Sequence, residues 1–294
     1  MDFMLRIALF LGTNFAILLI LSVSMSILGI EGVLDEQGVG LDLNSLLIMS
    51  SIIGFSGSII SLFISKWMAK KSMGVKIIST PKNDTEKWLL SINKELSQKA
   101  NINVPEFGIF DSKQPNAFAT GSSKNNSLVA VSTGLLVTMN KDEVEAVVAH
   151  EICHISNGDM VTMSLIQGII NTFVIFFSRI IGHLVDRLVF KVQRGHGPAY
   201  FITSIIAQIV LSILASIIVM WFSRRREYKA DSGAALLVGK EKMISALKVL
   251  GKQSTDPLPD QMAAFGISGN KKKISSLFSS HPSIEKRISA LLNL

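Results

Sequence analysis

Two histidines and a glutamate in the segment His150–His154, which reads H-E-x-x-H, are the residues best suited to chemistry. Residues four positions apart lie on one face of an α-helix, so His150 and His154 can direct both imidazoles at one metal ion. Neutral imidazole is a good ligand of zinc, and a catalytic zinc site keeps one position open for water. Glu151 is placed to accept a proton from that water. The motif therefore predicts metal-assisted hydrolysis at one zinc ion per chain.

A catalytic zinc ion needs a third protein ligand, and the chain has two candidates. Glu227 lies in the run Ser223–Asp231, beyond two long apolar stretches, and its carboxylate would complete a His-His-Glu set. Cys153 stands between the two histidines and could bind only if its thiol faced the ion. Glu227 is the better candidate, and Cys153 is interpreted as a small buried apolar residue. Because it is the only cysteine, no disulfide can form within the chain, which fits a reducing compartment.

The segment that carries the motif has the ends of a helix. Asn140 is a suitable N-cap, Glu143 follows three residues later as a capping-box partner, and Gly158 comes after the last turn. An apolar face for packing is supplied by Val144, Val147, Val148 and Ile152. An ordinary helix that carries this motif by chance is the alternative, and these well-formed ends make it less favoured.

The composition indicates a membrane protein. Hydrophobic residues make up 48% of the chain and charged residues only 17%, against about 25% charged in a typical soluble domain. Four apolar segments are long enough to cross a hydrocarbon core, which takes about 20 helical residues: Ile7–Ile30, Leu46–Ile64, Met160–Ser178 and Phe201–Phe222. The first is interpreted as an uncleaved anchor, because it is long for a signal peptide and no clear small-residue cleavage site follows it.

The distribution of Lys and Arg predicts how these spans are oriented. Residues 31–42 contain acidic side chains and no Lys or Arg, whereas lysines follow the second span and arginines follow the fourth. The N-terminus and the chain from about Lys66 onward are therefore expected on the cytoplasmic side. Residues 182–199 are also basic, which conflicts with this topology if both later spans cross. Since the metal ligands flank these two spans, the chain crosses twice there or not at all.

Charge and motifs also limit the partners. The net charge of +7 is attributed to basic residues beside the membrane, where anionic lipid headgroups lie, and not to a nucleic-acid surface. No G-x-x-x-x-G-K-[ST] loop is present, so nucleotide binding is not expected. The expected partners are the lipid bilayer and peptide or membrane-protein substrates, and the oligomeric state is left open.

Three regions follow from these patterns. Residues 1–66 are expected to form two transmembrane helices, and residues 67–159 with 223–294 a cytoplasmic zinc protease domain. Residues 160–222 are expected to form a transmembrane or membrane-associated helical hairpin. The predicted fold class is an α-helical membrane protein with an α+β catalytic domain, mostly helical with a small β-sheet.

Several elements of the soluble part can be placed. Helices are predicted from Asn83 or Asp84 to about Ala100, over Lys240–Lys252 and over Ser283–Leu292, and strands over Pro105–Ile109 and Ser127–Val131. The stretch Gln114–Gly121 between the strands is extended in character. It is either an edge strand that pairs with a substrate peptide or a connecting loop. Residues 254–273, rich in Pro, Gly and Ser, are interpreted as a mobile loop that could cover the cleft.

The three remaining histidines differ in context. His183 and His196 belong to the hairpin loop and are interpreted as non-functional. His281 lies in the catalytic half, followed by Pro282 and Arg287. Its role is either capping or core packing, or stabilisation of the transition state.

Taken together, several of these motifs resemble the HtpX-type membrane zinc metalloproteases, relatives of the CaaX prenyl endopeptidases. The resemblance covers essentially the whole chain. It rests on the two N-terminal spans, the phrase Asn116–Gly121, the metal motif followed by Ser156–Asp159, the run Ser223–Asp231, and His281-Pro282 with Arg287.

The resemblance implies a gluzincin-like catalytic domain and a role for each matching residue. His150, His154 and Glu227 would ligate zinc, and Glu151 would be the general base. Asp231 would orient a ligating histidine from outside the metal's ligand set, with His281 and Arg287 in support, while Asn116 and Ala117 would lie on the edge that aligns substrate. The resemblance also implies a bacterial inner-membrane protease that removes damaged or misfolded membrane proteins under stress.

Two other functions remain in view. Intramembrane-cleaving metalloproteases also use H-E-x-x-H but take an aspartate from another span. Here the motif helix carries Asp142, Glu143 and Glu145, which are costly in lipid, and the fourth span offers no suitable aspartate. A non-enzymatic, metal-stabilised scaffold or chaperone is disfavoured by the intact Glu151.

Overall fold

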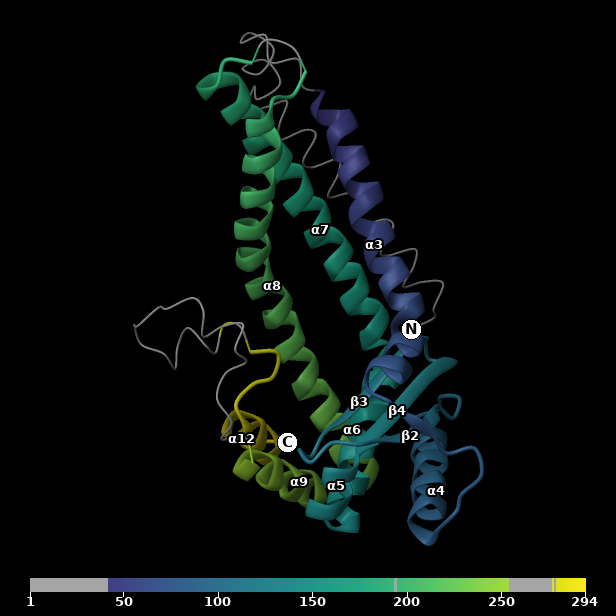
Figure 1. Ribbon diagram of the computed structural model, residues 1–294. Coiled ribbons are helices and arrows are strands. Elements are labelled where there is room, and N and C mark those ends of the chain that lie inside the picture. Colours follow the sequence, from purple (N-terminus) through teal and green to yellow (C-terminus); the bar gives the residue numbers. More distant parts are fainter. Residues whose placement is uncertain (1–41, 193–194, 254–276, 278) are drawn as a thin grey trace. The chain divides into compact units, whose positions relative to one another are not determined.

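The computed structural model describes residues 42–192, 195–253, 277 and 279–294 (Figure 1). By contacts, the chain divides into two compact units. One comprises residues 1–60 and 164–218, and the other residues 61–163 and 219–294. The segment 7–30, predicted as the first span, and the predicted loop 254–273 lie outside the described residues.

The second unit is built on a four-stranded sheet in the order β1-β2-β4-β3. Its strands are β1 (Lys76–Ile77), β2 (Glu106–Phe110), β3 (Ala117–Ser123) and β4 (Asn126–Ser132). Strands β2 and β4 are parallel, and the other two pairs are antiparallel. β4 is buried from its second residue onward, as its central place and its apolar Leu-Val-Ala-Val run require. β3 therefore lies at one edge of the sheet.

Five helices of the described chain lie wholly within this unit, and α6 contacts both the sheet and other helices (Figure 1). They are α4 (Asp84–Lys99), α5 (Thr133–Thr138), α6 (Lys141–Asn157), α9 (Lys240–Gln253) and α12 (Ile284–Leu292). α6 contacts β3 and β4 of the sheet and both α4 and α9, while α12 contacts α9. The core consists of aliphatic side chains from these elements, such as Leu89, Val148, Ile152 and Leu247. The fold thus surrounds the metal-motif helix on several sides and holds it in place.

The ends of α6 have the capping predicted for them. The Asn140 side chain accepts from the Glu143 amide at 3.0 Å, and the Glu143 carboxylate accepts from the Asn140 amide at 3.0 Å. At the other end, Gly158 has φ +70° and ψ +34°, a left-handed conformation that glycine adopts without steric cost. The turn at Gly158 ends the helix directly after the second histidine and starts α7.

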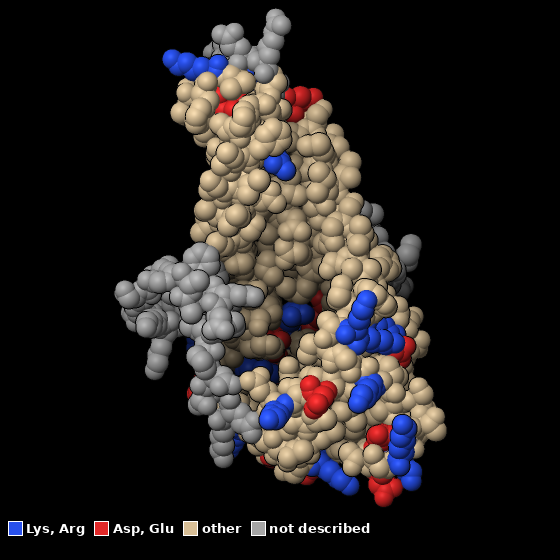
Figure 2. Space-filling view, viewed as in Figure 1, with Lys and Arg blue, Asp and Glu red and all other residues tan. Residues whose placement is uncertain are grey.

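The first unit contains parts of three long helices, α3 (Leu43–Ser72), α7 (Asp159–Leu184) and α8 (Pro198–Val238). Each is long and apolar enough to cross a membrane, and Figure 2 shows few charged side chains on the visible face of these helices. α3 and α7 are joined by a bond from the Ser164 hydroxyl to the Ser58 carbonyl at 2.8 Å. α7 continues as a π-helical turn, Val185–Val189. The chain is therefore a membrane protein, with a mostly helical fold and one small sheet as predicted.

The predicted elements can be compared with those observed. The two predicted strands correspond to β2 and β4, with ends that differ by one residue, and the segment 114–121 overlaps the edge strand β3. The three predicted helices of the soluble part correspond to α4, α9 and α12. Strand β1 and helix α5 had no counterpart in the prediction, because each is too short to show a periodic pattern. The division of the chain relative to a membrane stays a prediction.

Candidate metal centre

Three buried side chains from two helices bring their ligand atoms together. His150 and His154 lie on successive turns of α6, and Glu227 lies on α8 with only 1% of its surface exposed. The Nε2 atoms of the two imidazoles are 3.1 Å apart. Glu227 Oε2 lies 3.5 Å from His150 Nε2, and Oε1 lies 3.4 Å from His154 Nε2. One ligand atom from each residue thus converges on a common point.

These separations fit a tetrahedral zinc site. Zinc binds imidazole nitrogen and carboxylate oxygen at about 2.0–2.1 Å, which places neighbouring ligands of a tetrahedron about 3.3 Å apart. The two Nε2 atoms are 3.1 Å apart, and each lies 3.4 or 3.5 Å from a different oxygen of the Glu227 carboxylate, all close to that value. The donor set of two imidazoles and one carboxylate is also one that catalytic zinc sites use. The residues present therefore suit a single zinc ion with one position left for water.

Each histidine has a carboxylate partner on its other ring nitrogen. His154 Nδ1 lies at hydrogen-bonding distance from Asp159 Oδ2, 2.7 Å, whereas His150 Nδ1 lies 3.0 Å from Asp231 Oδ1 in an ion-pair contact that lacks the geometry of a hydrogen bond. A carboxylate at Nδ1 favours the tautomer that is protonated there and leaves the Nε2 lone pair for the metal. Both Nε2 atoms face Glu227, as this arrangement requires.

Arg287 and His281 surround the carboxylates from the C-terminal side. The buried Arg287 guanidinium donates to both oxygens of Asp231, at 2.7 and 2.6 Å, and lies 3.4 Å from Glu227 Oε2. His281 Nδ1 lies 2.7 Å from the same Glu227 oxygen, although its side chain is 61% exposed. Arg287 therefore acts as a buried anchor, whereas His281 lies at the solvent edge of the site.

The carboxylates around α6 change the acidity of both histidines. Burial of the imidazole lowers the pKa of His154, but Asp159 and Glu227 outweigh it and raise that pKa to about 10. The pKa of His150 is also raised, because Asp231 and Glu227 outweigh the burial of its ring. The charge of Glu151 contributes in the same direction at both histidines. The site thus attracts positive charge, and a metal ion would displace the protons held there.

Cys153 packs against α8 and is not one of the proposed metal ligands. It is buried against α8, where a Cβ added to Gly233 would come within 2.7 Å of its sulfur. Burial raises the pKa of the thiol to about 12, with the Asp159 and Asp231 charges adding to the effect. Among the described residues, the ligand atoms that converge come from His150, His154 and Glu227, and the Cys153 sulfur is not one of them. Its environment agrees with the interpretation of Cys153 as a packing residue, with Gly233 allowing the two helices to approach closely.

Asn116 and Ala117 lie at the start of the edge strand β3, and their backbones face different ways. The Asn116 carbonyl accepts from the Ser132 amide at 2.8 Å, and its amide donates to the Ser132 hydroxyl at 2.9 Å. Backbone groups alternate along an antiparallel strand, so those of Ala117 and Ala119 point to the open edge. Asn116 is left with only its side chain to offer a substrate, while Ala117 offers its backbone.

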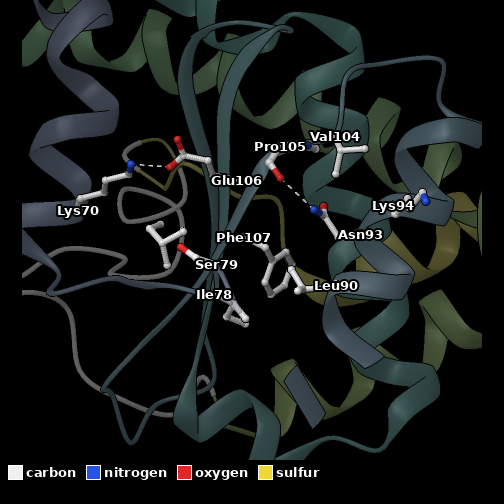
Figure 3. Close-up of a pocket in the computed structure, with 11 residues that line it drawn as sticks. Lys70, Ile78, Ser79, Leu90, Asn93, Lys94, Val104, Pro105, Glu106 and Phe107 are labelled. Atoms are coloured by element: carbon white, nitrogen blue, oxygen red, sulfur yellow. Dashed lines mark hydrogen bonds and ion pairs between the residues drawn. The ribbon is translucent and has the colours of Figure 1, made fainter. Parts of the chain in front are cut away.

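A groove of about 660 Å³ in the second unit shares no residue with the group His150, His154 and Glu227 (Figure 3). Lys70 from the end of α3 pairs there with Glu106 on β2, which Lys66 also contacts at 3.0 Å. The Asn93 amide donates to the Pro105 carbonyl at 3.0 Å. These contacts fasten α3 and α4 to the sheet.

Comparison with known proteins identifies the family. Residues 83–294 match Peptidase family M48. The chain is 60% identical over 288 residues to the Protease HtpX of Thioalkalivibrio sulfidiphilus, covering 97% of this chain and 98% of that protein. The chain belongs to peptidase family M48. A second relative, the Protease HtpX of Pseudoalteromonas atlantica, is 60% identical over 290 residues, covering 98% of this chain and 99% of that protein.

The fold of this M48 chain is also similar to a solved structure. The crystal structure of S. mikatae Ste24p superposes with a TM-score of 0.60 at 19% sequence identity, covering 97% of this chain and 67% of Ste24p. At this identity the similarity concerns the fold alone. The family assignment confirms the predicted resemblance and makes the chain a peptidase.

The structure gathers nearly all the predicted site residues of the M48 chain, and it adds one. His150, Glu151, His154, Glu227, Asp231, His281 and Arg287 belong to one neighbourhood of contacts and charges. Asp159 was not predicted to act on His154, although its place just after the helix-ending Gly158 was a usable signal. His183 and His196 contact each other in the hairpin, with ring centroids 5.5 Å apart, and are not part of the metal cluster.

Proposed function

We propose that the chain is a zinc-dependent endopeptidase. The observation that carries this proposal is the convergence of two imidazoles and one carboxylate at separations that suit a tetrahedral ion, beside the unligated Glu151. Two relatives that are 60% identical over 97% and 98% of the chain are named Protease HtpX, which supports the same activity.

We assign the chemistry to residues of α6 and their neighbours. Zinc, when bound, would polarise the scissile carbonyl and acidify a water molecule. Glu151 would take a proton from that water and pass it to the leaving amine. Asp159 and Asp231 hold the imidazoles in the ligating tautomer and orientation. His281, exposed beside Glu227, would stabilise charge that develops on the substrate in the transition state.

We propose that the substrate binds as an added strand along β3. In the described part of the chain β3 has a sheet neighbour on one side only. The outward backbone groups of Ala117 and Ala119 can pair with an extended peptide, which gives affinity with little dependence on sequence. α6 contacts β3 directly, so a peptide held there would lie near the helix that carries Glu151.

We further propose that the site works at the cytoplasmic face of a bacterial inner membrane and removes damaged or misfolded membrane proteins. The basic residues that flank the spans support the orientation. The resemblance to HtpX-type proteases supports the substrate class and the link to stress. A zinc ion, these substrates and the lipid bilayer are the proposed partners.

The surroundings of α6 favour this function over cleavage inside the bilayer. Asp142 and Glu145 of α6 both pair with Lys242 of α9, at 2.7 and 2.6 Å, and Asp142 is largely exposed. A helix with charged, exposed side chains packed on a β-sheet is typical of a water-facing domain. No comparable observation favours the scaffold alternative. A scaffold would need no free carboxylate beside the metal site, and among the described residues no hydrogen bond or ion pair gives Glu151 a structural role.

Replacing the proposed base tests the mechanism. Glu151→Gln keeps the size of the side chain but cannot accept a proton, so cleavage of a membrane-protein reporter should fall by about 100-fold or more. Bound zinc and thermal stability should stay unchanged. Glu145→Gln makes the same charge change on the same helix and should cleave normally. Retained cleavage by Glu151→Gln would refute the mechanism.

A further inference from the structure

Three arginines, Arg224–Arg226, precede Glu227 on α8, and two of them have partners within that helix. The Arg225 guanidinium lies over the Trp221 ring, 4.5 Å from its centroid. Arg226 donates to the Ser223 hydroxyl at 3.2 Å. These contacts suit side chains at a membrane boundary.

Arg224 instead reaches a segment far away in the sequence. Its Nη1 donates to the backbone carbonyls of Leu277 at 3.1 Å and Ser279 at 2.8 Å. Two bonds from one nitrogen to carbonyls two residues apart fix both the position and the direction of that backbone. Arg224 stands three residues before Glu227 on the same helix, so this contact ties the segment to the helix of the metal carboxylate.

The same segment leads directly to His281. The Ser279 hydroxyl donates to the His281 carbonyl at 2.7 Å, and His281 Nδ1 lies 2.7 Å from Glu227 Oε2. Because 61% of the His281 side chain is exposed, packing alone holds it weakly. Its place beside Glu227 therefore depends on the backbone that carries it, and Arg224 holds that backbone.

We propose that Arg224 is a positioning residue, which holds the backbone at Leu277 and Ser279 so that His281 stays against Glu227. The proposal rests on the proposed function, in which His281 stabilises the transition state. It gives Arg224 a task beyond the boundary charge that it shares with Arg225 and Arg226.

The position of the segment can be measured without any cleavage assay. A nitroxide attached to Ser280→Cys in the full-length, zinc-loaded protein reports the mobility of the backbone next to His281. Arg224→Ala should narrow the lines of the nitroxide's electron paramagnetic resonance spectrum, because the backbone at residue 280 becomes more mobile. Arg225→Ala, which removes the same charge one residue away, should leave the spectrum unchanged. An unchanged spectrum in Arg224→Ala would overturn the proposal, even if the chain cleaved nothing.

Kinetics then test whether Arg224 acts through His281. Arg224→Ala should lower kcat by about ten- to a hundred-fold, the effect of misplacing a transition-state group, with KM within about twofold. Combined with His281→Ala it should add no further loss, because both changes remove the same contact. Additive losses would contradict the proposal, while failure of the unchanged chain to cleave would count against the proposed function instead.

A charge-preserving variant separates the hydrogen bonds of Arg224 to the backbone from its positive charge beside the membrane. It can also be used if Arg224→Ala does not fold. Arg224→Lys keeps the positive charge at the membrane boundary but is shorter and more strongly hydrated than arginine. We expect a narrowed nitroxide spectrum and reduced kcat. Unchanged values for both would show that only the charge matters, and the proposal would be wrong.

Discussion

At the scale of single residues, the candidate metal centre includes two carboxylates, Asp159 and Asp231, that lie outside the proposed ligand set. Asp231 bridges His150 and Arg287, and Asp159 contacts His154. Because each histidine has its own carboxylate, the two imidazoles are oriented independently. Metal affinity should therefore be sensitive to either aspartate, although only one of them was predicted from the sequence.

Asp159 offers the cleaner test, since Asp231 also neutralises the buried Arg287. Asp159→Asn keeps the shape of the side chain but removes the charge that fixes the His154 tautomer. Zinc affinity should fall by about 10- to 100-fold, measured by competition with a chelator. Asp142→Asn, an exposed change at the start of α6, serves as the control and should bind zinc normally. Equal affinities for the two variants would contradict the assigned role of Asp159.

The spacing of residues in the sequence was enough to identify the proposed metal ligands, but not every residue that contacts them. The H-E-x-x-H pattern brings both histidines to one face through the geometry of a single helix. The capping signals at Asn140 and Gly158 predicted where that helix begins and ends. Contacts such as His281 with Glu227 and Arg224 with Ser279 join distant parts of the chain. They depend on how α8 and α12 pack, which no local pattern encodes.

At the scale of elements, the edge strand β3 and the helix α6 have separate tasks. α6 is held by the sheet, α4 and α9, and it places the reactive groups. β3 has seven residues and, in the described part of the chain, a sheet neighbour on one side only. The segment was predicted as either an edge strand that pairs with substrate or a connecting loop. The structure makes it an edge strand, and its pairing with a substrate stays a prediction.

Proline substitution can test whether β3 binds substrate. Ala119→Pro removes an amide that points to the open edge, where proline is tolerated. It should raise KM about tenfold through the loss of substrate hydrogen bonds, with little change in thermal stability. Thr120→Pro removes an amide that faces β4 and should lower the unfolding temperature. Normal KM in Ala119→Pro would rule out strand addition at this position.

At the scale of the whole molecule, three described helices can span a membrane, and the direction in which they do so is a prediction. Thiol labelling can test it, because the native Cys153 is buried and its pKa is raised to about 12. An impermeant maleimide should label Gln37→Cys in intact cells. It should label Lys286→Cys only after the membrane is opened. The reverse pattern would overturn the proposed cytoplasmic site.

The same experiment addresses the hairpin, for which the basic residues 182–199 gave conflicting signals. If α7 and α8 both cross the membrane, the maleimide should label Gly195→Cys in intact cells. If they do not cross, it should label this residue only after the membrane is opened. Hydropathy predicts where spans lie but not their depth, because tilt and partial insertion leave the same apolar pattern.

The central claim is that His150, His154 and Glu227 hold one zinc ion. Zinc X-ray absorption of the purified, full-length protein tests it most directly, together with the metal content. We predict one zinc per chain, with nitrogen and oxygen neighbours at about 2.0–2.1 Å and the scattering pattern of two imidazoles. Absence of zinc, or a sulfur neighbour at about 2.3 Å from Cys153, would contradict it.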